Sequence, residues 1–336
     1  MFKLNLPRWF RLPKLSIKIS MWKTFYIQPN QIGILYHRSD FKKVLLPGTY
    51  TYFGSHWNLK SYDLNQPEAK IDNLELLLRN HGTELQAYLS IVRTAFNQTA
   101  LVRLGQTWIS ILPNQLRAFW RGFIEVESHV FNLDENLELP TEFVQKVRST
   151  TLQGLKKFQV SEYELGLLYV QNNFVRPLES GEYAFWSVDK DVTVRNLSRV
   201  IPNPEFPQEN VLIEKHPDFV AAYCELVQLL GHQIAIVRDR GKVIAVLPPI
   251  SRKLFWQGVE VEIIDINIDA SLQPSLIAEL VAGSPEALST CTQYLHFCEV
   301  PVQHIGLLYI NQEFQSQLAR NSCLVEVWTL FSNGSD

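Results

Sequence analysis

The hydrophobic pattern of this chain repeats five times. In each copy a small residue is followed eight positions later by a bulky or apolar residue, and four positions after that by a leucine. The copies are Gly33/Phe41/Leu45, Ala100/Trp108/Leu112, Gly166/Phe174/Leu178, Ala235/Val243/Leu247 and Gly306/Phe314/Leu318. Because the spacing is kept while most other side chains vary, we interpret the copies as one structural unit repeated along the chain.

The alternation of apolar and polar residues predicts that each unit is an antiparallel β-meander of about forty residues. In the first unit the strands are expected at residues 32–36, 41–46, 49–53 and 59–64. Residues 37–40 supply a turn. Pro47-Gly48 fits the central positions of a type II turn, because proline presets φ and glycine accepts a positive φ.

Helical periodicity separates each complete odd unit from the even unit that follows it. Apolar side chains recur at helical spacing over residues 74–92 and again over residues 219–230. A unit of this size cannot bury a sufficient core by itself, so we expect the helices and sheets to cover one another. The sequence therefore predicts an α+β protein of five tandem β-rich repeats linked by helices, with the shared leucines facing inward. The predicted divisions are a basic aromatic arm (1–23), repeat pair one (24–155), repeat pair two (156–290) and an incomplete fifth repeat (291–336).

The composition is that of an ordinary globular protein, with 46% hydrophobic and 19% charged residues. The sequence contains no run of 18 or more apolar residues and no apolar core of signal-peptide type, so neither a transmembrane helix nor secretion is expected. Cys224, Cys291, Cys298 and Cys323 match no zinc or redox spacing, and we expect them to be reduced, as in a cytoplasmic protein.

The N-terminal segment is rich in basic and aromatic side chains and has no acidic residue over its first 23 positions. Two interpretations remain open: it contacts an anionic membrane surface, or it packs on the first unit. The candidate membrane-contact residues are Lys3, Arg8, Trp9, Phe10, Arg11, Lys14, Lys18, Trp22 and Lys23. Pro7 and Pro13 argue against one continuous helix. The net charge of −3 argues against a nucleic-acid partner.

Catalytic motifs are not found in the sequence. The eight histidines lack the spacing of a metal site, and no nucleophile elbow, Walker loop or dinucleotide fingerprint is present. Glu125 and Glu127, like Glu260, Glu262 and Asp265, alternate with valine or isoleucine, which is typical of a strand with one wet face. We therefore expect no catalytic residue, no cofactor and no metal.

Two segments resemble the N-terminal repeats of bacterial slipins, members of the stomatin/prohibitin/flotillin (SPFH) superfamily. They are Gln31-Ile-Gly-Ile-Leu-Tyr36 with Leu46-Pro-Gly48, and Glu164-Leu-Gly-Leu-Leu-Tyr169 with Phe185-Trp186. The resemblance extends over residues 24–330 and rests on apolar and turn positions. It implies a scaffolding role in membrane microdomains. The fifth unit departs from it, because it lacks the Pro-Gly turn and no long helical segment of the SPFH type follows.

These observations predict a non-enzymatic interaction or scaffold protein, cytoplasmic or peripheral at the inner face of a membrane. An open strand edge is expected at Leu324, Val325, Glu326, Val327 and Trp328, where a slipin-like protein or a second copy would add a strand. Two alternatives remain: a ligand-binding protein or enzyme with its site in a groove between units, and a peripheral membrane protein that uses the basic arm.

Overall fold

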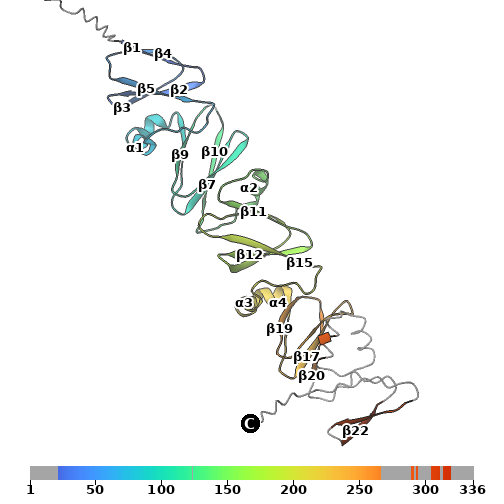
Figure 1. Cartoon of the computed structure of the whole chain (residues 1–336). Coiled ribbons are helices and arrows are strands. Elements are labelled where there is room, and N and C mark those ends of the chain that lie inside the picture. Colours follow the sequence, from blue (N-terminus) through green and yellow to red (C-terminus); the bar gives the residue numbers. More distant parts are fainter. Residues whose placement is uncertain are drawn as a thin grey trace, which may run out of the picture. The chain divides into compact units, whose positions relative to one another are not determined.

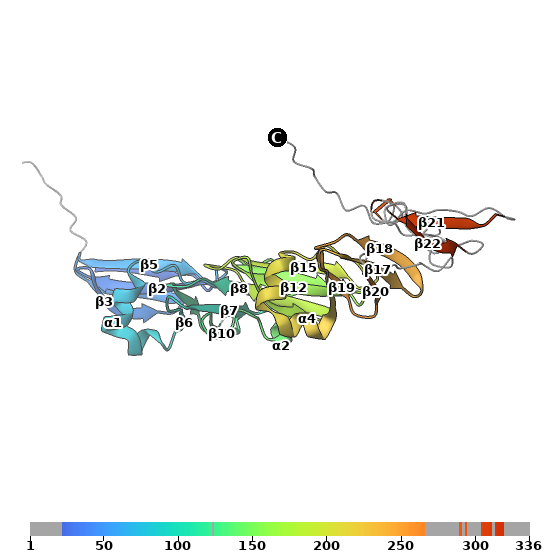
Figure 2. The same ribbon diagram turned by 90° about the horizontal axis from the view of Figure 1, so that it is seen from below.

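The computed structural model describes residues 22–122, 124–265, 289–290, 293, 304–310 and 313–318. The chain divides into two compact units, one ending at Leu155 and one beginning at Lys156. Both are built mainly from small antiparallel sheets with a few short helices (Figures 1 and 2). The α+β class with tandem β-rich units therefore holds.

The same set of five strands occurs four times, and we number these sets repeats 1 to 4. Repeat 1 contains β1 (Trp22–Ile27), β2 (Gln31–His37), β3 (Asp40–Leu45), β4 (Gly48–Phe53) and β5 (Trp57–Asp63). Repeat 2 contains β6 (Leu89–Arg93), β7 (Gln98–Leu104), β8 (Thr107–Ile111), β9 (Leu116–Trp120) and β10 (Val126–Asn132). Each repeat has one two-stranded and one three-stranded sheet.

The second compact unit holds the other two complete sets. Repeat 3 contains β11 (Leu155–Val160), β12 (Glu164–Val170), β13 (Asn173–Leu178), β14 (Gly181–Trp186) and β15 (Val192–Ser198). Repeat 4 contains β16 (Cys224–Gln228), β17 (Gln233–Asp239), β18 (Lys242–Leu247), β19 (Arg252–Trp256) and β20 (Glu260–Asp265). Only the hairpin β21 (Gly306–Ile310) and β22 (Glu313–Leu318) is described of a fifth set, so the count of five stays a prediction.

The predicted meander is wrong in its pairing. In a meander the third predicted strand, β4, would pair with β3, but β4 pairs with β1, while β3, β2 and β5 form the other sheet. The two sheets bury Ile27, Leu35 and Leu45 between them, whereas one continuous sheet would leave these side chains without a second layer. Gly48 makes the crossing with φ of 153°, not as the third residue of a type II turn.

The repeated leucine is buried in three of the described copies. Leu45, Leu178 and Leu247 are buried opposite Gly33, Gly166 and Ala235. In repeat 2 the residue opposite Ala100 is the buried Ile111, and Leu112 is only half-buried. The reason is that the β7–β8 hairpin lacks the bulge present in the other hairpins of this type, so its register advances by one residue.

Along the chain, helices lie between successive repeats, but they are shorter than expected. α1 (Leu74–Leu85) ends before Leu89 and Val92, which lie in β6. The second predicted helix is two helices, α3 (Glu209–Lys215) and α4 (Pro217–Tyr223), and Leu226 and Val227 lie in β16. A fourth helix, α2 (Thr141–Lys146), was not predicted. Leu89-Ser-Ile-Val92 also suits a half-buried strand, and its pairing with β9 decides the outcome.

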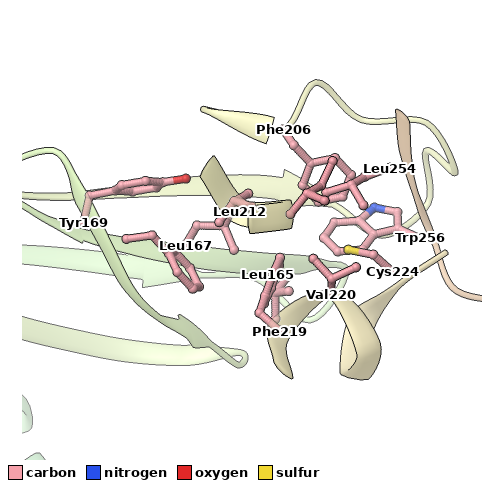
Figure 3. Packing of buried hydrophobic residues seen from close by; sticks show 12 residues of the cluster. Leu165, Leu167, Tyr169, Phe206, Leu212, Phe219, Val220, Cys224, Leu254 and Trp256 are labelled. Atoms are coloured by element: carbon pink, nitrogen blue, oxygen red, sulfur yellow. The ribbon is translucent and has the colours of Figure 1, made fainter. Parts of the chain in front are cut away.

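The helices join paired repeats through shared apolar cores. Leu85 of α1 packs with Ile32 and Ile34 of repeat 1 and with Leu89 and Trp120 of repeat 2. In the second unit, α3 and α4 supply Leu212, Ile213, Phe219 and Val220 to a core that reaches from repeat 3 to repeat 4 (Figure 3). We call these two cores joint 1–2 and joint 3–4.

Candidate interaction surface on the first repeat

The outer face of each two-stranded sheet carries two cross-strand pairs at the first and third strand positions. In repeat 2 these pairs are Leu89 with Trp120 and Ile91 with Ala118. All four residues belong to joint 1–2. In repeat 4 the corresponding pairs, Cys224 with Trp256 and Leu226 with Leu254, belong to joint 3–4. This face is therefore covered by a helix in both even repeats.

In repeat 1 the same face is exposed. Its outward side chains are Trp22, Thr24 and Tyr26 from β1 and Thr49, Thr51 and Phe53 from β4, and we call this set the aromatic face. Trp22, Tyr26 and Phe53 are 60%, 67% and 58% exposed. Three large aromatic side chains on one sheet face form a patch of the kind that marks an interaction site.

Contacts between neighbouring strands hold the aromatic face in place. The rings of Trp22 and Phe53 meet edge to face, with centroids 5.2 Å apart. The Thr24 and Thr51 hydroxyl oxygens are 3.1 Å apart, within hydrogen-bond distance. The antiparallel pairing of β1 with β4 brings together residues about thirty positions apart in sequence. The face is thus a preformed surface.

Basic groups lie at the end of repeat 1 where β1 begins. The Lys23 ammonium donates to the Trp57 carbonyl at 2.6 Å, and the Trp57 indole N–H donates to the Phe53 carbonyl at 3.0 Å. Arg38 stands at the tip of the β2–β3 hairpin at this same end, where its backbone N–H donates to the His56 carbonyl. Residues 1–64 carry ten lysines and arginines and two acidic residues.

Of the predicted membrane-contact residues, Trp22 and Lys23 lie in β1 and are exposed. Lys3, Arg8, Trp9, Phe10, Arg11, Lys14 and Lys18 lie outside the described residues, as does the predicted edge strand at Leu324, Val325, Glu326, Val327 and Trp328. The prediction missed Tyr26 and Phe53. The alternation Trp22-x-Thr24-x-Tyr26 was a signal for them, but it marks a face only once β1 is recognised as a strand.

A cluster of charged and polar side chains lies on repeat 2, where α2 meets the three-stranded sheet. Arg103 Nε donates to Glu127 at 2.8 Å, and His129 Nε2 lies 2.8 Å from the other Glu127 oxygen. The hydrogen bond with His129 and the charge of Arg103 hold the pKa of the Glu127 carboxyl below its usual range. A carboxylate that is ionised and hydrogen-bonded to two side chains is suited to a structural role rather than to proton transfer.

An open depression of about 470 Å³ adjoins this site, lined by Arg103, Gly105, Gln106, Trp108, Glu127 and Lys146. It belongs to one repeat. Apolar side chains fill joint 1–2 and joint 3–4, and the groove between repeat units that the ligand-binding alternative needs stays a prediction. Among the described residues, this depression offers the ligand-binding alternative one candidate site.

Metal and thiol chemistry find little support in the part of the chain that the structure describes. No group of three His, Cys, Asp or Glu residues there is arranged to hold a metal ion. Burial raises the pKa of the Cys224 thiol to about 12, which keeps it protonated and unreactive. Among the same residues we find no helix with the length and apolar character needed to cross a membrane.

Comparison of the whole chain with protein-family models gives no match, and comparison with curated proteins gives none either.

Proposed function

We propose that the protein is a non-enzymatic scaffold, built from small two-sheet repeats, that assembles with a slipin-like protein or with a second copy of itself. The observation that carries the proposal is the pair of helix-filled joints. They bury the outer faces of the two-stranded sheets in repeats 2 and 4, whereas the aromatic face of repeat 1 is exposed. Stacked repeats of this kind commonly serve as binding surfaces.

The resemblance to slipin repeats supports the choice of partner. It rests on turn and apolar positions of repeats 1 and 3, and such positions specify a fold more than an activity. The expected role is assembly at a membrane microdomain from the cytoplasmic side. The predicted edge at Leu324–Trp328 is the candidate for strand addition.

Light scattering coupled to size-exclusion chromatography tests assembly. The full-length chain, alone or with a bacterial slipin, is expected to give masses above its own 38.8 kDa that rise with concentration. Val325→Pro removes an N–H from the predicted edge and is expected to lower the assembled fraction. Val325→Thr keeps the strand propensity and is the matched control. A mass of 38.8 kDa at every concentration, with and without the slipin, contradicts the proposal.

A further inference from the structure

The aromatic face differs in chemistry from the helix-covered faces that occupy the same place in repeats 2 and 4. The pairs Leu89–Trp120 and Ile91–Ala118 of repeat 2 correspond to Trp22–Phe53 and Thr24–Thr51 of repeat 1. A covering helix would bury the two threonine hydroxyls among aliphatic side chains, which costs free energy even though the hydroxyls lie close enough to bond each other. The face suits an environment that is part apolar and part hydrated.

Such an environment exists at the headgroup layer of a bilayer. Tryptophan and tyrosine collect there because an apolar ring and a polar N–H or O–H are both accommodated. Trp22 and Tyr26 are of this type, and Phe53 adds apolar area beside Trp22. The threonines between them keep contact with water.

The charge distribution selects an anionic surface. Residues 1–64 contain ten lysines and arginines against two acidic residues, and the rest of the chain contains 21 against 32. Positive charge is thus concentrated in and before repeat 1, while the remainder is acidic. Near an anionic surface this distribution attracts the part of the chain that bears the aromatic face and repels the rest.

We propose that repeat 1 docks on an anionic lipid surface. Trp22, Tyr26 and Phe53 enter the headgroup layer, and the positive charge concentrated in residues 1–64 draws this face to the lipid phosphates. The inference goes beyond scaffold assembly, because lipid contact is made by this chain itself and needs no partner protein.

Vesicle flotation of the full-length chain tests the proposal. Phosphatidylcholine vesicles that contain phosphatidylserine are expected to bind at least about tenfold more protein than vesicles of phosphatidylcholine alone, and added salt is expected to weaken binding. The double variant Trp22→Ser/Phe53→Ser is expected to lower binding by about tenfold, because both apolar groups leave the headgroup layer. Tyr26→Ser is expected to give a smaller loss.

The matched control is Phe96→Ser, which removes an aromatic side chain that is 72% exposed on repeat 2. It is expected to bind like the unaltered chain, and thermal unfolding should show that all variants remain folded. A variant with Lys3, Arg8, Arg11, Lys14 and Lys18 changed to Gln measures the share of the basic segment and is expected to lose the preference for phosphatidylserine.

Two results would overturn the proposal: equal binding to both vesicle types, or full binding by the folded double variant. If the double variant instead changes the mass in light scattering and leaves vesicle binding intact, the aromatic face is a protein interface and lipid docking is wrong. A monomeric chain that still binds phosphatidylserine vesicles contradicts the scaffold function alone.

Discussion

Joint 1–2 and joint 3–4 occupy equivalent places and are filled in different ways. α1 spans 12 residues with a kink at His81 (φ −134°, ψ 28°); its Leu74, Leu77 and Leu78 are only partly buried, and its buried side chain is Leu85. α3 and α4 are two helices of seven residues each that bury Leu212, Ile213, Phe219 and Val220. Joint 3–4 therefore excludes water from more of its helical surface.

The hydrogen bonds of the two joints differ as well. In both joints the backbone N–H of a tryptophan in the even repeat donates to the carbonyl of a proline earlier in the chain, Trp120 to Pro67 and Trp256 to Pro202. Joint 3–4 adds the Trp256 indole N–H donating to the Ser198 carbonyl at 2.8 Å and the Tyr169 hydroxyl donating to the Pro207 carbonyl at 3.2 Å. Burial raises the pKa of Tyr169 in joint 3–4 and of Tyr62 in joint 1–2 to about 12, so these tyrosines do not distinguish the joints. The comparison indicates that one backbone frame supports joints with different amounts of buried helical surface.

Truncating the helix core should have the largest effect and should separate the joints. Leu212→Ala is expected to destabilise joint 3–4 by about 3 kcal/mol, because a fully buried leucine leaves a cavity. Leu77→Ala in α1 is expected to cost about 1 kcal/mol, since that side chain is already partly hydrated. Hydrogen exchange of the β19 and β9 amides measures each joint separately. Equal losses would contradict the distinction.

A methyl group added opposite the repeated leucine tests how tightly each repeat is packed. A Cβ at Gly166 would lie 2.8 Å from Val160 Cγ2 and 3.2 Å from Leu178 Cβ, both stiff parts of their side chains. Gly166→Ala is therefore expected to cost about 2 kcal/mol.

At Gly33 the Cβ would meet the Cδ1 atoms of Ile27 and Leu59 at 2.7 Å, and these are side-chain ends that can rotate away. Gly33→Ala is expected to cost about 1 kcal/mol. Urea unfolding of both variants checks the order. The comparison fails if Gly33→Ala is the more damaging change.

Sequence alone predicted the hairpins well, because each is specified locally. The buried pairing of Gly33 with Leu45 and of Gly166 with Leu178 follows from two-residue periodicity and a short turn. The β7–β8 hairpin differs from the prediction because it lacks the bulge of the other hairpins. The loss of a bulge shifts the register by one residue without changing the apolar pattern, so Leu112 was assigned the place of Ile111.

The sheet pairing and the candidate surface depended on long-range contacts. The alternation in β4 is the same whether it pairs with β3 or with β1, so the two-sheet repeat could not be read from it. Basic and aromatic composition indicated Trp22 and Lys23 as contact residues. Phe53 joins them only because β1 and β4 are neighbours.

A strained turn in repeat 4 offers a smaller, stabilising change. Ile250 has φ of 62° and is 79% exposed, and its equivalent in repeat 2 is Asn114 with φ of 56°. A β-branched residue pays about 1 kcal/mol or more in this conformation, whereas asparagine adopts it readily. Ile250→Asn is therefore expected to stabilise repeat 4 by about 1 kcal/mol.

The reciprocal change, Asn114→Ile, is expected to destabilise repeat 2 by a similar amount, about 1 kcal/mol. Urea unfolding followed by hydrogen exchange in β17 and β7 reads the two repeats separately. If both substitutions shift stability in the same direction, the strain argument is wrong.

The smallest effect concerns the ion pairs on the three-stranded sheets of repeats 2 and 4. Arg103 binds Glu127 and Arg238 binds Glu262, each at 2.8 Å, and Glu127 is also bonded to His129. Because the pKa of Glu127 is lowered in the folded state, its stabilising effect is present above the ordinary carboxyl range and is lost as the pH falls through the folded pKa. The groups are partly hydrated, so the effect on unfolding is small.

NMR titration of the Glu127 carboxyl carbon should give a pKa below the usual range, and His129→Ala should raise it. If the titration is unchanged in His129→Ala, the histidine does not supply the effect.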